Sequence, residues 1–291
     1  MDVSINGARI LATIENVPVF GSVQITQTLT ASWLVMLIIS GLLIWLGSGL
    51  KVSGISRKQA VAEMAYTSLV NFVRGNMGTG FDHYIPLVGT IFITSVISNL
   101  ISLLGIWSPT ADLMTELAWA LVVFVLITYH KIKSSGIGGY LKGFLDPIFV
   151  MAPINVMSEL FTPISMACRH FGNILSGTVI SALIYGALTA ASYGLMNLLG
   201  SSVFAALGTA AIGIILFFFG KTKKKKALKV VGIILAVLGV LALVSLVGIQ
   251  FPWLTIGIPA ITSFYFDWFG GCIQAFIFCT LTTIFIKQAA G

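Results

Sequence analysis

Seven long apolar stretches constrain this chain more than any other feature of its sequence. About 20 residues cross the ~30 Å of membrane hydrocarbon as a helix. The stretches cover residues 31–50, 84–106, 114–130, 166–190, 201–219, 227–250 and 261–287. A helix satisfies its own backbone polar groups in lipid, and the alternating pattern of a membrane β-strand is absent. The sequence therefore predicts an all-α integral membrane protein with about seven membrane helices.

Composition supports this fold class and argues against several functions. Only 9% of the 291 residues are charged, against roughly 25% in an average soluble domain. The three cysteines lie in apolar segments without CxxC spacing, so neither a disulfide framework nor a metal site is indicated. No nucleotide motif or other cofactor site is evident. Residues 1–30 begin without a signal-peptide pattern, and we expect them to be a polar lead-in on the outer side.

The positions of the basic residues predict the orientation in the membrane, because Lys and Arg accumulate in short cytoplasmic loops. Starting outside, the successive inner loops carry Lys51, Arg57, Lys58, Arg74, then Lys131, Lys133, Lys142, then six lysines in KTKKKKALK at 221–229, then Lys287. Only Arg9 and Arg169 fall elsewhere. The net charge of +7 is thus explained by topology and contact with anionic lipid. Nucleic acid is not expected as a partner.

A mixed stretch in the first inner loop predicts a helix. SRKQAVAEMAYTSLVNFVRGNMG spaces apolar and charged residues at roughly helical intervals. It suits either a helix at the membrane surface or a soluble helix that caps the bundle. GIGGYLKG at 136–143 lacks the spacing of a phosphate loop, and we interpret it as a flexible turn.

Polar residues inside the apolar stretches are the candidate functional residues. An Arg or Asp at the centre of a membrane helix costs about 2.5 to 3.5 kcal/mol, so such residues usually mark a pathway or a partner. Arg169, Asn173 and Ser165 share one helix face. Asp267 and Gln274 share another, with Gly270 and Gly271 between them, where a second helix can approach closely. The other candidates are Glu159, Asp112, Asn99 and Ser98. The alternative is a set of ion pairs and hydrogen bonds that only hold the helices together.

Two long motifs carry a resemblance to a known family. RHFGNILSG at 169–177 resembles the R-L-F-G-N-M-x-A-G signature of subunit a of rotary F-type ATP synthases. GCIQAFIFCTLTTIFI at 271–286 resembles the closing helix of that subunit. The supporting matches, in family order, are SNLISLLG, PTADLMTELAWAL, KIKSSGIGGYLKGF and PISMACR.

The resemblance implies a stator subunit that passes H⁺ or Na⁺ through two half-channels to and from carboxylates on a rotating c-ring. It implies a tilted helix pair that faces this ring, with Arg169 opposite the carboxylates and Asn173 in support. Guanidinium keeps its proton in proteins, so Arg169 favours the ionised carboxylate without relaying protons itself. ATP synthesis itself takes place in other subunits, so no catalytic chemistry is expected in this chain.

The resemblance assigns further positions. Gln274 matches the closing-helix glutamine, Asp267 falls where the family carries a titratable residue of the outer half-channel, and Glu159 resembles the acid of the inner one. Thr178 stands where many members have an acid or histidine, and a hydroxyl can hydrate an ion path but not relay protons as a carboxylate does. His170 replaces a leucine and points away from the face of Arg169, as a packed neutral imidazole or as a relay group.

One departure from the family is large. Arg169 and Gln274 are usually joined by a short outer connection, whereas here two additional apolar runs flank KTKKKKALK. We expect a single membrane domain over 1–291, made of the lead-in, core helices at 31–190, an inserted hairpin at 191–260 with a cytoplasmic lysine-rich tip, and a closing helix at 261–291. The hairpin is predicted to lie away from the ring.

The leading interpretation is an ion-translocating subunit of ATP synthase in a bacterial plasma membrane. Its expected partners are the c-ring, peripheral stalk subunit b, other subunits of the complex and membrane lipid. The alternative is an ion-coupled secondary transporter in which Arg169 binds an anionic substrate. Inverted repeats would support that alternative, and the two halves of the chain show no convincing similarity. The choice between H⁺ and Na⁺ stays open.

Overall fold

The computed structural model describes residues 7–17, 21–53, 55–146, 148–199, 203–222, 225–246, 253–255, 261–262 and 264–291. The two strands are β1 (Ile10–Val17) and β2 (Gly21–Thr26). The α-helices are α1 (Gln27–Gly47), α2 (Arg57–Met77), α3 (Ile85–Ser102), α4 (Leu113–Gly143), α5 (Ala152–Leu199), α6 (Val203–Thr222), α7 (Lys226–Leu246) and α9 (Gly271–Ala290). The shorter helical segments are η1 (Thr79–Tyr84), η2 (Pro109–Ala111), η3 (Phe149–Met151), η4 (Trp253–Thr255) and the π-helical η5 (Phe264–Gly270).

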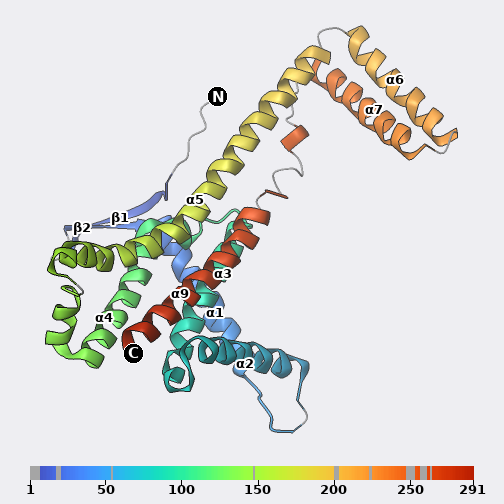
Figure 1. Cartoon of the computed structure of the whole chain (residues 1–291). Coiled ribbons are helices and arrows are strands. Elements are labelled where there is room, and N and C mark those ends of the chain that lie inside the picture. Colours follow the sequence, from blue (N-terminus) through green and yellow to red (C-terminus); the bar gives the residue numbers. More distant parts are fainter. Residues whose placement is uncertain are drawn as a thin grey trace. The chain divides into compact units, whose positions relative to one another are not determined.

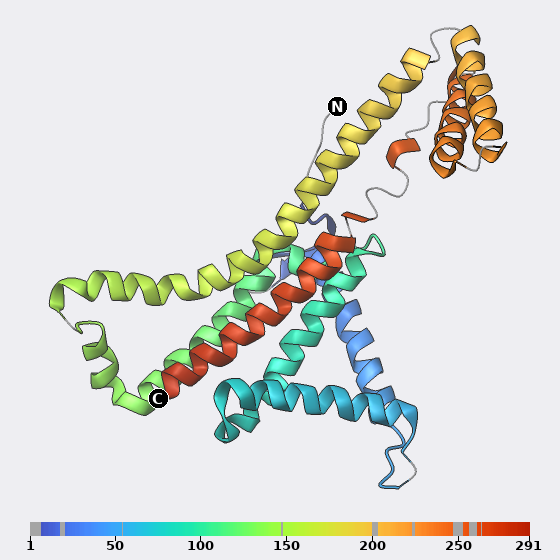
Figure 2. The same cartoon turned by 45° about the vertical axis from the view of Figure 1, so that its right-hand side comes forward.

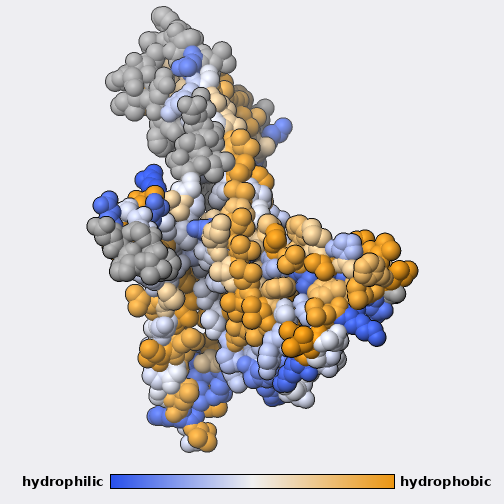
Figure 3. Space-filling view, turned by 90° about the vertical axis from the view of Figure 1, so that its left-hand side faces the viewer, coloured by the Kyte–Doolittle hydropathy of each residue, from blue (hydrophilic) through white to orange (hydrophobic). Residues whose placement is uncertain are grey.

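The helices confirm the predicted membrane architecture. Among the described residues, six helices are long and apolar enough to cross a membrane, and Ala206–Lys221 is a shorter apolar helix. Large apolar side chains such as Leu37, Ile44 and Val125 are exposed, as expected for a surface that lipid covers. On the face shown in Figure 3, hydrophobic residues cover the flanks of the helices and hydrophilic ones gather at their lower end.

The chain forms two compact units, which α5 connects. One unit holds residues 179–262, and the other holds 6–178 with 263–291. In the larger unit, α9 packs between α3 and α4 (Figure 1). Val88, Val123, Met166, Phe278 and Ile286 belong to its buried apolar cluster. The helix that follows the insertion in sequence therefore lies inside the bundle formed by the helices that precede it.

Helix α2 lies across one end of this bundle. Figure 2 shows it crossing the ends of α1 and α3. The Ser56 hydroxyl accepts a hydrogen bond from the Gln59 amide at 3.2 Å, which caps the first turn of α2. At the other end, Arg74 donates to both carboxylate oxygens of Asp82, and this bond raises the pKa of Arg74. A helix over this stretch is thus confirmed, and it contacts the end of the bundle.

Two local features differ from the sequence-based expectation. Strands β1 and β2, in the stretch expected as a polar lead-in, pair in antiparallel fashion, with Ala12 opposite Ile25 and Ile14 opposite Val23. The turn predicted over residues 136–143 is much shorter in the structure than expected. Only Gly136 leaves the helical conformation, with φ of 72°, a value that glycine adopts without strain. The following residues return to helix and complete α4.

The segment that the sequence analysis predicts to be an insertion contains a tightly packed pair of helices. Helices α6 and α7 pack against each other through glycines. A Cβ atom added at Gly213 would lie 2.2 Å from the backbone nitrogen of Ala236, and one added at Gly232 would lie 2.4 Å from that of Phe217. Small residues allow such close backbone approach, which is a common basis of helix association in membranes.

The glycine contact predicts a sharp sensitivity to side-chain size. Gly213→Val should force α6 and α7 apart and cost about 1–3 kcal/mol. Gly208→Val is the matched control on α6, since a Cβ atom there meets nothing within 4 Å. Hydrogen–deuterium exchange of α6 and α7 in the purified complex should rise for Gly213→Val only. Equal exchange in the two variants would contradict the close packing.

Candidate functional site

Arg169 lies on an exposed face of α5. Its side chain has no hydrogen-bond or ion-pair partner among the described residues, and Ser165, one turn earlier, is also exposed. Asn173, one turn later on the same face, is half-buried, and Thr178 is exposed with its hydroxyl donating to the Leu175 carbonyl at 2.8 Å. The predicted polar face is therefore present. It leaves a permanent positive charge at the surface of a membrane helix.

Two glycines bring the start of α9 against the side-chain amides of α3 and α5. A Cβ atom added at Gly271 would lie 2.5 Å from Nδ2 of Asn99, and one added at Gly270 would lie 3.2 Å from Nδ2 of Asn173. Both Nδ2 atoms are buried without a hydrogen-bond partner among the described residues. The close approach that the sequence predicted at these glycines is thus confirmed. The residues that it reaches are both predicted site residues.

The closing segment carries Asp267 and Gln274. Asp267 lies in η5, a π-helical segment, and its side chain is outside what the structure describes. Single-turn π-helical segments occur frequently at functional sites. Gln274 is half-buried in the first turn of α9. The backbone therefore places both residues beside the joint formed by Gly270 and Gly271.

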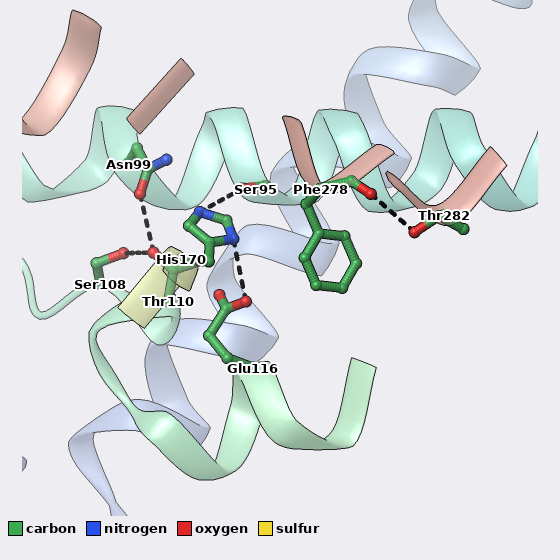
Figure 4. A network of polar contacts seen from close by, with 8 residues as sticks. All are labelled: Ser95, Asn99, Ser108, Thr110, Glu116, His170, Phe278 and Thr282. Atoms are coloured by element: carbon green, nitrogen blue, oxygen red, sulfur yellow. Dashed lines mark hydrogen bonds and ion pairs between the residues drawn. The ribbon is translucent and has the colours of Figure 1, made fainter. Parts of the chain in front are cut away.

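A hydrogen-bond network joins α3 to the loop before α4. The Thr110 hydroxyl donates to Oδ1 of Asn99 at 2.9 Å (Figure 4). The Ser108 hydroxyl donates to the Ser98 carbonyl at 2.9 Å. Asp112 is the N-cap of α4, where its Oδ1 accepts from the Met114 amide at 3.0 Å. Asp112 thus has a structural contact here, and Asn99 is fixed by Thr110 on one side while its Nδ2 faces α9.

The most deeply buried charged groups of the described residues were not among the predicted site residues. Nδ1 of His170 lies 3.0 Å from Oε2 of Glu116, and the two side chains are 2% and 0% exposed. On the other side of the ring, Nε2 of His170 lies 3.2 Å from the Ser95 hydroxyl. The packed position expected for His170 is confirmed. Its acidic partner was missed because Glu116 lies on another helix, and no local spacing connects the two residues.

Glu159 forms an ion pair with Lys131 from α4. The pair lines a recess of about 230 Å³, together with Ser158, Thr162 and Gln288. Oε1 of Glu159 is buried without a hydrogen-bond partner among the described residues. Pro163, four residues later, has no backbone N–H and so cannot donate to the Glu159 carbonyl. The structure thus separates Glu159 and its recess from the cluster around Asn99, Asn173 and Gly271.

These features define the class of protein. Several membrane helices carry charged and polar side chains within their apolar segments, as expected of an ion-translocating membrane protein. The family model of the ATP synthase A chain matches residues 29–221. The chain therefore belongs to the ATP synthase subunit a family, the ion-translocating stator component of the membrane sector. It is not a catalytic subunit of that complex, and the family assignment replaces the alternative of a secondary transporter.

Individual relatives agree with this assignment. Subunit a of Prosthecochloris aestuarii is 32% identical over 188 residues, which are 62% of this chain and 82% of that protein. A subunit a of Crocosphaera subtropica is 32% identical over 185 residues, covering 61% and 78% of the two chains. The sodium ion specific subunit a of Propionigenium modestum is 32% identical over 179 residues, covering 56% and 62%.

The joint at Gly271 predicts a functional cost for one added methyl group. In Gly271→Ala, the Asn99 side chain must move and lose its bond to Thr110, at about 1–3 kcal/mol. Gly75→Ala on α2 is the control, since a Cβ atom there meets nothing within 4 Å. Thermal unfolding of the assembled complex and ATP-driven ion pumping in vesicles should both decline for Gly271→Ala alone. If both variants behave like the native protein, α9 does not depend on this contact.

Proposed function

We propose that Arg169 faces the ring of c subunits and forces each arriving carboxylate to release its ion. The guanidinium is exposed and has no partner among the residues that the structure describes, which supports this proposal. An internal ion pair would have left it no free side for the carboxylate of another subunit. A cation beside a carboxyl group favours the ionised form. Since guanidinium stays protonated, it blocks direct passage between the two sides of the membrane. The proposed tilted pair that faces the ring consists of α5 and α9.

The outer half-channel is proposed to run past Asp267, Gln274, Asn173 and Asn99. The support is the joint at Gly270 and Gly271, which gathers two partly unsatisfied amides beside the closing segment. Asp267 is the proposed titratable residue of this path, and Asp112 is proposed near its outer opening. Thr178 contributes a hydroxyl to the same side.

The inner half-channel is proposed at Glu159. Its support is the recess of about 230 Å³ that Glu159 lines with Lys131, Ser158 and Thr162. A carboxylate with one oxygen free of hydrogen bonds to the described residues needs water or a proton in such a place. The two proposed half-channels thus lie on different sides of Arg169 along α5.

The orientation follows from the charge pattern. We propose that the lysine-rich loops are cytoplasmic and that the membrane is a bacterial plasma membrane, as the distribution of Lys and Arg favours. The proposed partners are the c-ring, subunit b of the peripheral stalk, other subunits of the complex and lipid. The hairpin of α6 and α7 is proposed to pack against another stator subunit or anionic lipid, through the lysines at its tip.

The proposal for Arg169 is tested by ion pumping driven by ATP in vesicles that contain the assembled complex. Arg169→Ala and Arg169→Lys should each lower coupled pumping at least about tenfold, since they remove the permanent charge or replace it with one that burial can neutralise. Arg57→Ala on the exposed start of α2 is the matched control and should pump normally. Equal assembly is verified first. Near-native pumping by Arg169→Ala would place the ring contact elsewhere.

The proposal for Glu159 needs a variant that separates ion conduction from charge balance. Glu159→Gln should lower pumping several-fold, both by removing the carboxylate and by leaving Lys131 unpaired. Lys131→Gln/Glu159→Gln removes both charges and so restores the balance of the pair. If Glu159 lies on the ion path, the double variant stays slow in the same vesicle assay. Recovery of native rates in the double variant would make the pair structural.

A further inference from the structure

Glu116, His170 and Ser95 come together from three helices. Glu116 lies in the first turn of α4, His170 on α5 beside Arg169, and Ser95 in the middle of α3 (Figure 4). Phe278 of α9 covers the imidazole, with ring centroids 6.1 Å apart. The glutamate and histidine side chains are almost fully buried. No other charged or titratable side chain among the described residues forms an ion pair or hydrogen bond with either of them, and neighbouring Arg169 is exposed.

A buried pair of this kind is an expensive way to join helices. Taking a carboxylate and an imidazole out of water costs several kcal/mol, and apolar residues of similar volume often stabilise a core equally well. The pair is also incompletely satisfied, because neither carboxylate oxygen of Glu116 nor Nδ1 of His170 makes a hydrogen bond with the described residues, although Nδ1 and Oε2 lie 3.0 Å apart. An acid and a histidine in contact can hold a proton that apolar residues cannot. The free-energy cost of burying this pair therefore indicates that its role is to hold a proton.

The surroundings suit a proton better than a metal cation. Hard cations are held by several oxygen ligands. Here the imidazole nitrogen takes up one side of the carboxylate, and the Ser95 oxygen contacts the far nitrogen of the ring rather than the carboxylate. Among the described residues, no group of three or more His, Cys, Asp or Glu side chains could hold a metal ion together. A histidine with a carboxylate on one nitrogen and a hydroxyl on the other can bind and release a proton.

The cluster is connected to the proposed outer half-channel. Ser95 shares a face of α3 with Ser98 and Asn99, three and four residues later. Asn99 contacts α9 at Gly271, and the adjacent Gly270 contacts Asn173 of α5. Asn173 is one turn from Arg169 on the proposed ring-facing side. Polar groups thus extend from His170 toward the ring through residues already assigned to the path.

We infer that His170 is a proton-loading station of the outer half-channel, with Glu116 as its counter-charge and Ser95 as its exchange point, so that this subunit conducts H⁺. In the loaded state, Nδ1 of the imidazolium forms an ion pair with the Glu116 carboxylate, and Nε2 donates a hydrogen bond to Ser95. Release breaks the Nε2–H bond and forms an O–H bond on Ser95, whose original proton passes to the next acceptor. The imidazole stays protonated at Nδ1, and a proton returning by the same route restores the pair.

This inference deepens the proposed function and rests on it. It also gives the outer path a titratable group near Arg169, which the hydroxyl of Thr178 does not supply. The pair joins positions far apart in sequence. A substitution of only one member would leave the other buried without its partner. Only a simultaneous substitution of both could therefore preserve the proton site or the packing.

The test uses the assembled complex in vesicles, with ATP-driven acidification as the readout. Glu116→Gln and His170→Gln should each slow pumping at least about tenfold and flatten its dependence on outer pH. Glu116→Leu/His170→Leu replaces the pair by apolar volume and should assemble but stay slow. Glu15→Gln and His83→Gln are matched controls at exposed positions. Native rates in the double leucine variant would show that the pair only braces the helices.

A measurement on the native complex decides the matter even if no variant assembles. The native protein should acidify vesicles in sodium-free buffer at an unchanged rate when Na⁺ is added. ATP-driven uptake of ²²Na⁺ would overturn the inference. The Arg169→Ala variant distinguishes a failure of the proposed function from a failure of the proton-station inference. If that variant pumps normally, the proposed function fails, whereas normal pumping by the Glu116 and His170 variants alone overturns only the proton station.

Discussion

The close contact of α9 with α3 and α5 at Gly270 and Gly271 is the interaction on which the candidate site depends. Hydrophobic burial does not drive helices together inside a lipid bilayer, because lipid tails are as apolar as the side chains. Association there relies on van der Waals contact and polar bonds. Two adjacent glycines let the backbone of the closing segment reach Asn99 and Asn173 directly. Without that approach, the residues that the sequence places far apart would not form one polar region.

The titratable and charged side chains of the larger unit lie in two opposite environments. Glu116 and His170 are buried and contact each other, whereas Arg169 is exposed and has no partner among the described residues. A lone guanidinium on a membrane helix is tolerated when a partner outside the chain or water compensates it. The contrast separates the two roles along α5. The exposed charge is available to another subunit, and the buried pair is not.

The sequence predicted the helices well and the long-range pairing poorly, for physical reasons. Apolar runs set where membrane helices form, so the stretch at 227–250 anticipated α7 and that at 84–106 anticipated α3. Polar faces also follow from helical periodicity, which placed Asn173 beside Arg169. The pairing of Glu116 with His170 depends on how three helices pack, and nothing in the local sequence encodes it. The strands Ile10–Val17 and Gly21–Thr26 were missed because segments this short carry only a weak periodic signal.

The inserted hairpin can be accommodated without disturbing the site because of membrane topology. A segment inserted between two membrane helices preserves the direction of the later helix only if it crosses the bilayer an even number of times. One crossing by each of α6 and α7, as the sequence predicts, would satisfy this condition. Their glycines, such as Gly213 and Gly232, pack them against each other, so the pair satisfies much of its packing internally. Helix α9 can then enter the bundle beside α3 with the direction it would have without the insertion, and the contact at Gly271 is retained.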